Sequence, residues 1–331
     1  MASAAAAEPR RAPGGGLFVP STLWLDQEDA RERIDEKRRS HQIGADTARG
    51  LSHFAEQGHL IFSLDVDPAT FDQLLGAVDR RWEEKPADLA YAYDGPARRM
   101  THADEARERR TRYRIHDLHS HSPAALALYL NRQIFDWVDL ILGEEPVAIQ
   151  SLTFEYGSQQ LLHRDQVVVP TASPGHLVAA WIALEDIGPD CGPLVYVPGS
   201  HRLPCYETAP GEYEFDGRRM GPEVVEAGLA WEAEQERRRG LEPRLFTARR
   251  GDVLLWHAAL RHGGSEVRDE RLTRRSFVVH YSTRSTYDRR SITLGEPVEG
   301  GERWQVLETR ELLERDGCHG FQNPLLGYGA G

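Results

Sequence analysis

Apolar residues recur at helical spacing in the N-terminal third of the chain. Residues 68–82 and 123–142 carry apolar side chains three or four positions apart, and each stretch begins with a proline, which favours the first turn of a helix. The charged stretch 29–57 has sparse apolar positions and predicts an exposed helix. Gly58 ends it, and residues 59–66 then predict a short strand. We therefore expect this third to be mainly helical.

From Pro146 onward, short β-rich segments bounded by Gly, Pro or Asp replace the helical pattern. They are residues 147–156, 166–170, 176–184, 193–199, 244–248, 252–258 and 274–282. Seven strands of this kind fit a barrel or jelly roll. Together with the helices before them, they predict a β-rich α+β fold.

Three polar stretches interrupt these patterns. Residues 1–15 are rich in Ala, Gly, Pro and Arg, and we expect them to be a disordered tail. Residues 86–121 show no clean period and predict a long loop that borders the substrate site. Residues 206–244 are too charged for a core and predict an inserted helical lid. We expect a single domain over 16–331, with its core barrel at about 146–284.

Composition narrows the class of protein. The 331 residues are 40% hydrophobic, which is enough for a substantial core, and the formal net charge of −12 argues against a nucleic-acid partner. No apolar run reaches the roughly 18 residues of a membrane span, and the first residues lack the apolar region of a signal peptide. The three cysteines are widely spaced and form no zinc motif. We expect a cytoplasmic protein without membrane or nucleic-acid partners, and a homo-oligomer is compatible with these features.

His163 and Asp165 stand two positions apart, and residues two apart on an extended strand point to the same face. Both side chains can then reach one metal ion. With one distant histidine they would form the two-histidine, one-carboxylate set, which leaves positions open on iron(II) for a co-substrate and oxygen. A His-x-Asp triplet alone also occurs by chance, and a buried histidine is more often only hydrogen-bonded.

His257 and His262 compete for the place of the third ligand. We prefer His262, because it lies at the end of a predicted strand beside Gly263 and Gly264, which allow close approach of the backbone to an ion. His257 lies within the apolar strand, which is typical of a hydrogen-bonded core histidine.

Arg274 and Ser276 lie on one face of the predicted strand 274–282, together with His280. Arg275 lies on the other face. A guanidinium with a hydroxyl two residues away is suited to hold the far carboxylate of 2-oxoglutarate through charge-assisted hydrogen bonds. The alternative is an exposed arginine pair that makes surface salt bridges.

The order of these features resembles the phytanoyl-CoA dioxygenase family of iron(II) and 2-oxoglutarate-dependent oxygenases. After His163 and Asp165 come WIALED (181–186), CGPLVYVPGSHR (191–202), GDVLLWH (251–257), His262-Gly263 and the arginine strand. The resemblance is strong over about 146–284, and FAEQGHLIFS (54–63) with the helix after it also resembles the family's N-terminal section. It implies a double-stranded β-helix (jelly-roll, cupin-like) with flanking helices. It also implies a dioxygenase that converts 2-oxoglutarate and O2 to succinate and CO2 while it oxidises a substrate.

Carried over by position, the resemblance places His163, Asp165 and His262 on the iron ligands. Arg274 falls on the residue that binds the distal carboxylate of 2-oxoglutarate. Related iron halogenases replace the carboxylate ligand with Ala or Gly, so Asp165 favours hydroxylation or another oxidation.

Other residues are candidates for contacts with 2-oxoglutarate, and two of them also have a purely structural interpretation. Ser276 would assist the arginine. Trp181 matches a position that lines the co-substrate, although a large ring on a barrel strand is ordinarily packing. Gln150 resembles a glutamine that contacts 2-oxoglutarate in relatives, although an outward polar residue would look the same. Gly264 departs from relatives that carry a small hydroxyl residue there, and His201 is interpreted as fastening a turn.

Two other classes of protein remain open on the sequence. One is a non-catalytic jelly-roll protein that binds a ligand, and the other is a mononuclear zinc hydrolase, since two histidines and one carboxylate also suit zinc. The zinc alternative leaves the arginine strand unexplained. The expected partner is a small-molecule substrate, a secondary metabolite or an acyl compound, whose identity the variable loops of the family do not reveal.

Overall fold

One large antiparallel sheet dominates the chain, and its strands come from distant parts of the sequence. The computed structural model describes residues 10–11, 16–18, 21–84, 90–93, 99–102, 109, 113–167, 169, 171, 173–208, 210, 212, 221–285 and 311–322. The strand order is β3 (His59–Ser63), β12 (Asp252–His257), β8 (Val178–Ala183), β14 (Ser276–Thr283), β7 (Pro146–Phe154), β6 (Tyr113–His116), β4 (Ala90–Tyr93) and β5 (Arg99–His102).

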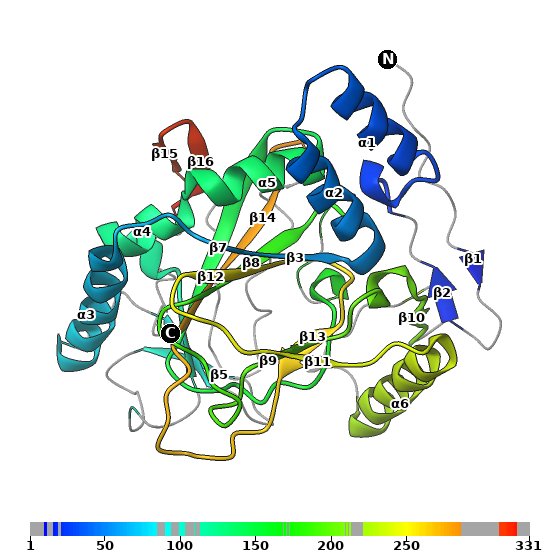
Figure 1. Ribbon diagram of the computed structural model, residues 1–331. Coiled ribbons are helices and arrows are strands. Elements are labelled where there is room, and N and C mark those ends of the chain that lie inside the picture. Colours follow the sequence, from blue (N-terminus) through cyan, green and yellow to red (C-terminus); the bar gives the residue numbers. More distant parts are fainter. Residues whose placement is uncertain are drawn as a thin grey trace.

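A smaller sheet of β11 (Arg244–Phe246), β9 (Leu194–Tyr196) and β13 (His262–Gly264) lies against one face of the large sheet (Figure 1). The two sheets bury a shared apolar cluster between them. Trp181, Trp256 and Val278 come from the large sheet, and Tyr196 and Phe246 come from the small one. This is the predicted jelly-roll core of an α+β fold, and the expected fold class is confirmed.

Helices cover the other face of the large sheet (Figure 1). They are α2 (Ala45–Gln57), α3 (Pro68–Glu84), α4 (Pro123–Tyr129) and α5 (Arg132–Leu142). Because side chains alternate along a strand, β14 sends Phe277, Val279 and Tyr281 to this helical layer and Val278 to the interior between the sheets. The face assignment made from the sequence of this strand is confirmed.

The remaining elements lie at the edges. The short helix η1 (Trp24–Asp26) precedes α1 (Ala30–Arg39), and α6 (Pro222–Arg239) lies beside a three-stranded sheet of β1 (Arg10–Arg11), β2 (Gly16–Phe18) and β10 (Cys205–Tyr206). The hairpin of β15 (Leu312–Arg315) and β16 (Cys318–Phe321) joins β7, with β16 parallel to it. Among the described helices, none has the length and apolar character that crossing a membrane requires.

Two helix predictions need correction. The stretch 29–57 contains two helices, and α2 is not exposed throughout, because Leu51 and Phe54 are buried in the core. The predicted helix 123–142 is also two helices, because α4 ends at Tyr129 and Asn131 begins α5. The Asn131 side chain accepts a hydrogen bond from the backbone of Ile134 at 3.1 Å, which satisfies a free N–H group of the new helix.

The predicted loop 86–121 is wrong over 90–93, 99–102 and 113–116, because β4, β5 and β6 extend the large sheet. A 3-10 turn, η3 (Leu118–Ser120), lies near the end of this stretch. Strand β6 has only four residues, and the charged Arg114 interrupts the run of apolar residues that would indicate a buried strand. That arginine is buried with its guanidinium 5.6 Å from the centre of the Phe154 ring. Tertiary burial of a charged residue cannot be read from local periodicity.

Two smaller predictions also change. The predicted strand 166–170 is wrong, since Asp165–Val167 form a 3-10 turn (η4) and the backbone of Val169 bonds back to the carbonyl of Asp165 at 2.7 Å. Of the predicted tail 1–15, only Arg10 and Arg11 are described, and they pair with β2 rather than being free. The other residues of that tail lie outside the described part of the chain.

Candidate active site

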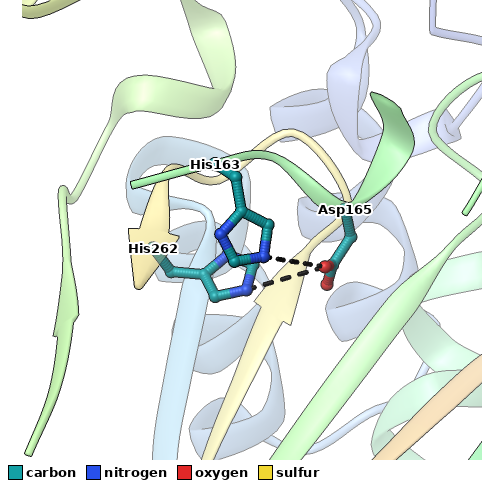
Figure 2. Close-up of side chains that lie close together, drawn as sticks. All are labelled: His163, Asp165 and His262. Carbon is teal, nitrogen blue, oxygen red and sulfur yellow. Dashed lines mark ion pairs between the residues drawn. The ribbon is translucent and has the colours of Figure 1, made fainter. Parts of the chain in front are cut away.

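Two chain segments bring the predicted ligands together. The backbone of His163 pairs with that of His262 in an isolated antiparallel bridge, with N···O distances of 2.9 and 3.0 Å. Asp165 then begins the 3-10 turn, so the expectation of an extended strand through His163 and Asp165 is wrong. The turn nevertheless points the carboxylate toward both imidazoles, as Figure 2 shows.

The geometry of the three side chains is that of a potential metal site. Asp165 Oδ1 lies 3.8 Å from His163 Nε2 and 3.6 Å from His262 Nε2. One potential ligand atom from each side chain lies within 4.8 Å of the other two. His257 points elsewhere, and its Nε2 lies 3.0 Å from Asp26 in η1. The structure therefore groups His262, and not His257, with the other two residues.

Backbone carbonyls set the orientation of both imidazoles. His163 Nδ1 lies 2.9 Å from the carbonyl oxygen of Leu161, and His262 Nδ1 lies 3.0 Å from that of Leu260. A carbonyl can only accept, so each Nδ1 carries the proton and donates it. Each Nε2 is then left with a lone pair directed at the shared position, as metal-binding histidines require.

The second oxygen of Asp165 is held from the opposite side. Trp256 Nε1 donates to Oδ2 at 2.8 Å, and His280 Nε2 lies 3.4 Å from the same atom. Gln150 Nε2 lies 3.1 Å from His280 Nδ1, so Gln150 contacts the carboxylate only through His280. This arrangement fixes the carboxylate with Oδ1 facing the two ligand histidines.

Charge on Asp165 is favoured by its surroundings. Burial by itself would raise the pKa of this carboxyl, but the neighbouring imidazoles outweigh that effect. His262 and His280, with a smaller contribution from His163, lower the pKa of Asp165 well below its usual range. The site therefore presents a carboxylate at neutral pH.

Arg274 lies two residues before the start of β14, at the opposite end of the interior from the three potential metal ligands. Its guanidinium carbon lies 5.3 Å from the centre of the Phe154 ring and 5.7 Å from that of Trp181, and the residue is buried. Arg275 points to the opposite face of the strand, with Nη2 3.5 Å from the buried Glu155 and Nη1 4.0 Å from Glu185. Of the two arginines, only Arg274 faces the interior between the sheets.

Two polar atoms near Arg274 are buried without a hydrogen-bond partner among the described residues. They are Nε1 of Trp181 and Oγ of Ser276. Ser276 pairs with Ala183 of β8, two positions along that strand from Trp181, so both side chains point into the interior. A buried donor left unpaired costs about 1–3 kcal/mol, so these two atoms offer a place for a polar partner that the described residues do not supply.

Gly263 and Gly264 let the loop before His163 lie directly on β13. A Cβ atom on Gly264 would stand 2.6 Å from the backbone nitrogen of Gln159 and from Ser158 Oγ, and one on Gly263 would stand 2.6 Å from the Gln160 carbonyl oxygen. The absence of a hydroxyl residue at Gly264 therefore has a steric cause in this chain. The loop must approach closely for His163 to reach His262.

Sequence reasoning missed two contacts of the site. The predicted strand places His280 on the face of Arg274, which is a usable signal, but Trp256 lies in an apolar strand and the sequence analysis gives it no role. Their shared partner, Asp165, is distant from both in the sequence, and only the folded chain brings the three together.

Comparison with known proteins agrees with this arrangement. A family model described as phytanoyl-CoA dioxygenase matches residues 54–276, which is more than half of the chain. The chain belongs to the phytanoyl-CoA dioxygenase family. The family is one of iron(II) and 2-oxoglutarate-dependent dioxygenases, so the predicted enzyme class is confirmed at the level of the family.

Sequence similarity to a curated family member is limited to one section. The mouse (Mus musculus) protein named phytanoyl-CoA dioxygenase domain-containing protein 1 is 29% identical over 90 residues, which are 26% of this chain and 31% of that protein. The match thus spans about a third of that relative.

Solved structures similar to this family member share its fold. The epimerase SnoN in complex with Fe3+, alpha ketoglutarate and nogalamycin RO superposes with a TM-score of 0.58 at 17% identity, over 84% of this chain and 99% of that chain. For the apoform of EctD from S. alaskensis the TM-score is 0.54 at 20% identity, over 77% and 82%. The carbocyclase SnoK from nogalamycin biosynthesis gives 0.53 at 18%, over 74% and 85%.

Proposed function

We propose that this chain is an iron(II) and 2-oxoglutarate-dependent dioxygenase that hydroxylates or otherwise oxidises a small organic molecule. The observation that carries the proposal is that the two carboxylate oxygens of Asp165 have different neighbours. Oδ1 faces the Nε2 atoms of His163 and His262, while Oδ2 is held away from them by Trp256 and His280. Such an arrangement presents one carboxylate oxygen and two neutral imidazoles to a single ion.

The donor set fits iron(II). In our proposal His163, Asp165 and His262 hold the metal, and the carbonyl contacts of both Nδ1 atoms keep the imidazoles in the tautomer that binds it. Three protein ligands leave further positions of an octahedral ion for the co-substrate and O2. A catalytic zinc site could use the same ligands, but it would have no use for the buried arginine at the far end of the interior.

The far end of the interior fits the second carboxylate of 2-oxoglutarate. Arg274 supplies a buried positive charge beside the indole of Trp181, and the unpaired Trp181 Nε1 and Ser276 Oγ are donors that a carboxylate would satisfy. We assign these three residues to the co-substrate. Gln150 differs from them, because its contact is with His280 beside Asp165, and we therefore propose that it acts through His280.

When bound, iron would let O2 act as the oxidant, with 2-oxoglutarate and the substrate each giving up two electrons, because no side chain of this chain can insert an oxygen atom. The protein's share is positioning and exclusion. Asp165 and the two histidines fix the metal position, Arg274 orients the co-substrate, and the aromatic interior around Trp181 and Trp256 keeps water away. The same fold serves small-molecule enzymes of nogalamycin biosynthesis, and we include a small-molecule substrate in the proposal.

Anaerobic titration of the metal-free protein with iron(II) and then 2-oxoglutarate tests the proposal. Chelation of the metal by a 2-oxo acid gives a weak visible charge-transfer band, which we expect in the wild type and not in His163→Ala. His257→Ala is the matched control, because His257 contacts Asp26 and not the metal position. Admission of O2 should then yield succinate from 2-oxoglutarate even without the natural substrate.

Absence of the band in folded, metal-loaded wild type would contradict the proposal. Iron binding without any effect of 2-oxoglutarate would instead favour a non-catalytic ligand-binding protein. Tight zinc binding with hydrolase activity and no succinate would favour the zinc enzyme.

A further inference from the structure

Helix α6 contacts both segments that carry the proposed metal ligands. Arg164 stands between His163 and Asp165 in the sequence, and its Nε lies 3.2 Å from Glu232 Oε2 of α6. Arg261 directly precedes His262, and its Nε lies 3.0 Å from the same oxygen. A single carboxylate oxygen on α6 therefore bridges the two segments.

A second carboxylate completes the cluster. Arg261 Nη1 forms an ion pair with Glu236 Oε1 at 2.7 Å, one helical turn beyond Glu232. The side chains are 3% exposed for both arginines, 10% for Glu232 and 7% for Glu236, so water screens these pairs little. Two positive and two negative groups leave no net charge in the cluster. Removal of one member would leave a buried charge without its partner, which is strongly destabilising for its neighbours.

Other contacts fasten the same region and give the cluster a rigid base. Arg164 also donates from Nη1 to the Leu203 carbonyl at 3.1 Å and from Nη2 to the Pro204 carbonyl at 3.3 Å, just before β10. Trp231, next to Glu232 in α6, lies over Gly16 of β2, where a Cβ atom would stand 2.3 Å from the indole. Arg164 therefore links α6 to the segment before β10 as well as to the segment of the ligands.

We propose that Glu232, assisted by Glu236, is a positioning residue for the metal centre. By bridging Arg164 and Arg261 it holds the segment of His163 and Asp165 against the segment of His262. The backbone bridge between His163 and His262 aligns the two segments at one residue pair. The Glu232 carboxylate adds a second link, through Arg164, next to Asp165. This inference rests on the proposed metal site, and it gives the inserted helix a role in metal binding that its charged sequence does not suggest.

The test compares two glutamate substitutions on the same helix. Glu232→Gln keeps the size of the side chain and removes the charge that both arginines share. Glu234→Gln is the control, because Glu234 pairs with Arg238 at 2.6 Å on the exposed side of α6. Iron(II) affinity is measured anaerobically for both, and amide hydrogen exchange is followed in residues 161–166 and 260–264.

We expect Glu232→Gln to weaken iron(II) binding roughly 10- to 100-fold, as is usual when a residue that orients a metal ligand is lost. We also expect faster exchange in both ligand segments of the metal-free protein, with Glu234→Gln unchanged in both measurements. Equal affinity and equal exchange in the two variants would overturn the inference. If Glu232→Gln does not fold, Glu236→Gln removes only one partner of Arg261 and allows the same comparison.

The two proposals can fail separately. Wild-type protein that binds no iron would remove the proposed function, while the exchange rates of the metal-free protein would still decide whether Glu232 holds the two segments together. Wild-type protein that binds iron as tightly as a folded Glu232→Gln variant would leave the function intact and remove the positioning role.

Discussion

At the scale of single residues, Asp165 gives its two oxygens different neighbours. Oδ1 faces the imidazoles of His163 and His262, and Oδ2 accepts a hydrogen bond from Trp256. A carboxylate held on one side cannot rotate freely, so its free oxygen stays directed at the metal position. The residue is therefore both a ligand candidate and the point at which the two sheets and the ligand loop meet.

Asp165→Ala should abolish substrate oxidation and weaken iron(II) binding. The loss should exceed the roughly 10- to 100-fold typical of residues that only orient ligands. Anaerobic iron titration measures it, with Asp190→Ala as control, since Asp190 pairs with Arg268 at 3.8 Å on the surface. Unchanged iron affinity and full turnover in Asp165→Ala would rule out the proposed ligand set.

Substitution of the two buried tryptophans should weaken the binding of two different ligands. Trp256→Phe removes the donor to Asp165 Oδ2 and should lower iron(II) affinity about tenfold, with little direct effect on 2-oxoglutarate. Trp181→Phe removes the unpaired donor beside Arg274 and should weaken 2-oxoglutarate binding by about 1 kcal/mol, or roughly fivefold, at constant iron affinity. Equilibrium binding of each ligand to both variants checks this, and equal effects of the two substitutions would contradict the assignment.

Arg274→Ala should weaken 2-oxoglutarate binding by roughly 10- to 100-fold, the value of a hydrogen-bonded charge pair. Arg275→Ala should change it little, because Arg275 points to Glu155 and Glu185 outside the interior. The dissociation constant of 2-oxoglutarate in the iron-loaded protein is the quantity to measure. The opposite order of effects would mean that the other face of the strand binds the co-substrate.

At the scale of secondary structure, the break between α4 and α5 shows how one polar side chain divides an apolar stretch. Apolar residues continue at helical spacing across the break, but Asn131 caps the second helix through its bond to Ile134. Leu130 between them is buried, so the break is part of the core. After the break, α5 packs against β7 and β14, while α4 contacts α3 and the 3-10 turn before it.

Asn131→Ala should therefore reduce the free energy of unfolding by about 1 kcal/mol, because the first turn of α5 loses its capping acceptor. Urea denaturation of the metal-free protein measures the change. Asn131→Asp, which keeps an acceptor at the same position, is the matched control and should be close to wild type. Equal stability of the Ala and Asp variants would show that the cap contributes nothing.

At the scale of the whole molecule, buried histidines link folding to pH. Burial lowers the pKa of His201 to about 3 and that of His59 to about 4, so both are neutral in the folded chain at neutral pH. In the unfolded chain a histidine takes up a proton below about pH 6.5. Their contribution to stability is therefore present above that pH and is lost as the pH falls toward the folded values.

Between pH 7 and pH 5, each of these histidines should remove about 2 kcal/mol from the free energy of unfolding. His201→Gln should flatten this pH dependence by about that amount, whatever it does to stability at pH 7. Urea denaturation at several pH values gives the slope for both proteins. Parallel curves for wild type and His201→Gln would contradict the role assigned to His201.

The sequence by itself predicted most of this chain where the signal is local. Short β-rich segments bounded by Gly, Pro or Asp predicted β8, β12 and β14, and the order of His163, Asp165, His262 and Arg274 pointed to residues that the fold brings to one interior. These signals are readable because a strand's period and a loop's glycines act over a few residues.

Only the tertiary structure decided the rest, because it depends on partners distant in the chain. Strand β6 was interpreted as loop, since burial of Arg114 against Phe154 is invisible in a short charged segment. The stretch 206–244, which contains α6, is too charged for a core by sequence, although Glu232 lies buried between Arg164 and Arg261. A charged residue enters an interior when a counter-charge, a hydrogen-bond partner or an aromatic face offsets its loss of water, and that group comes from wherever the fold places it.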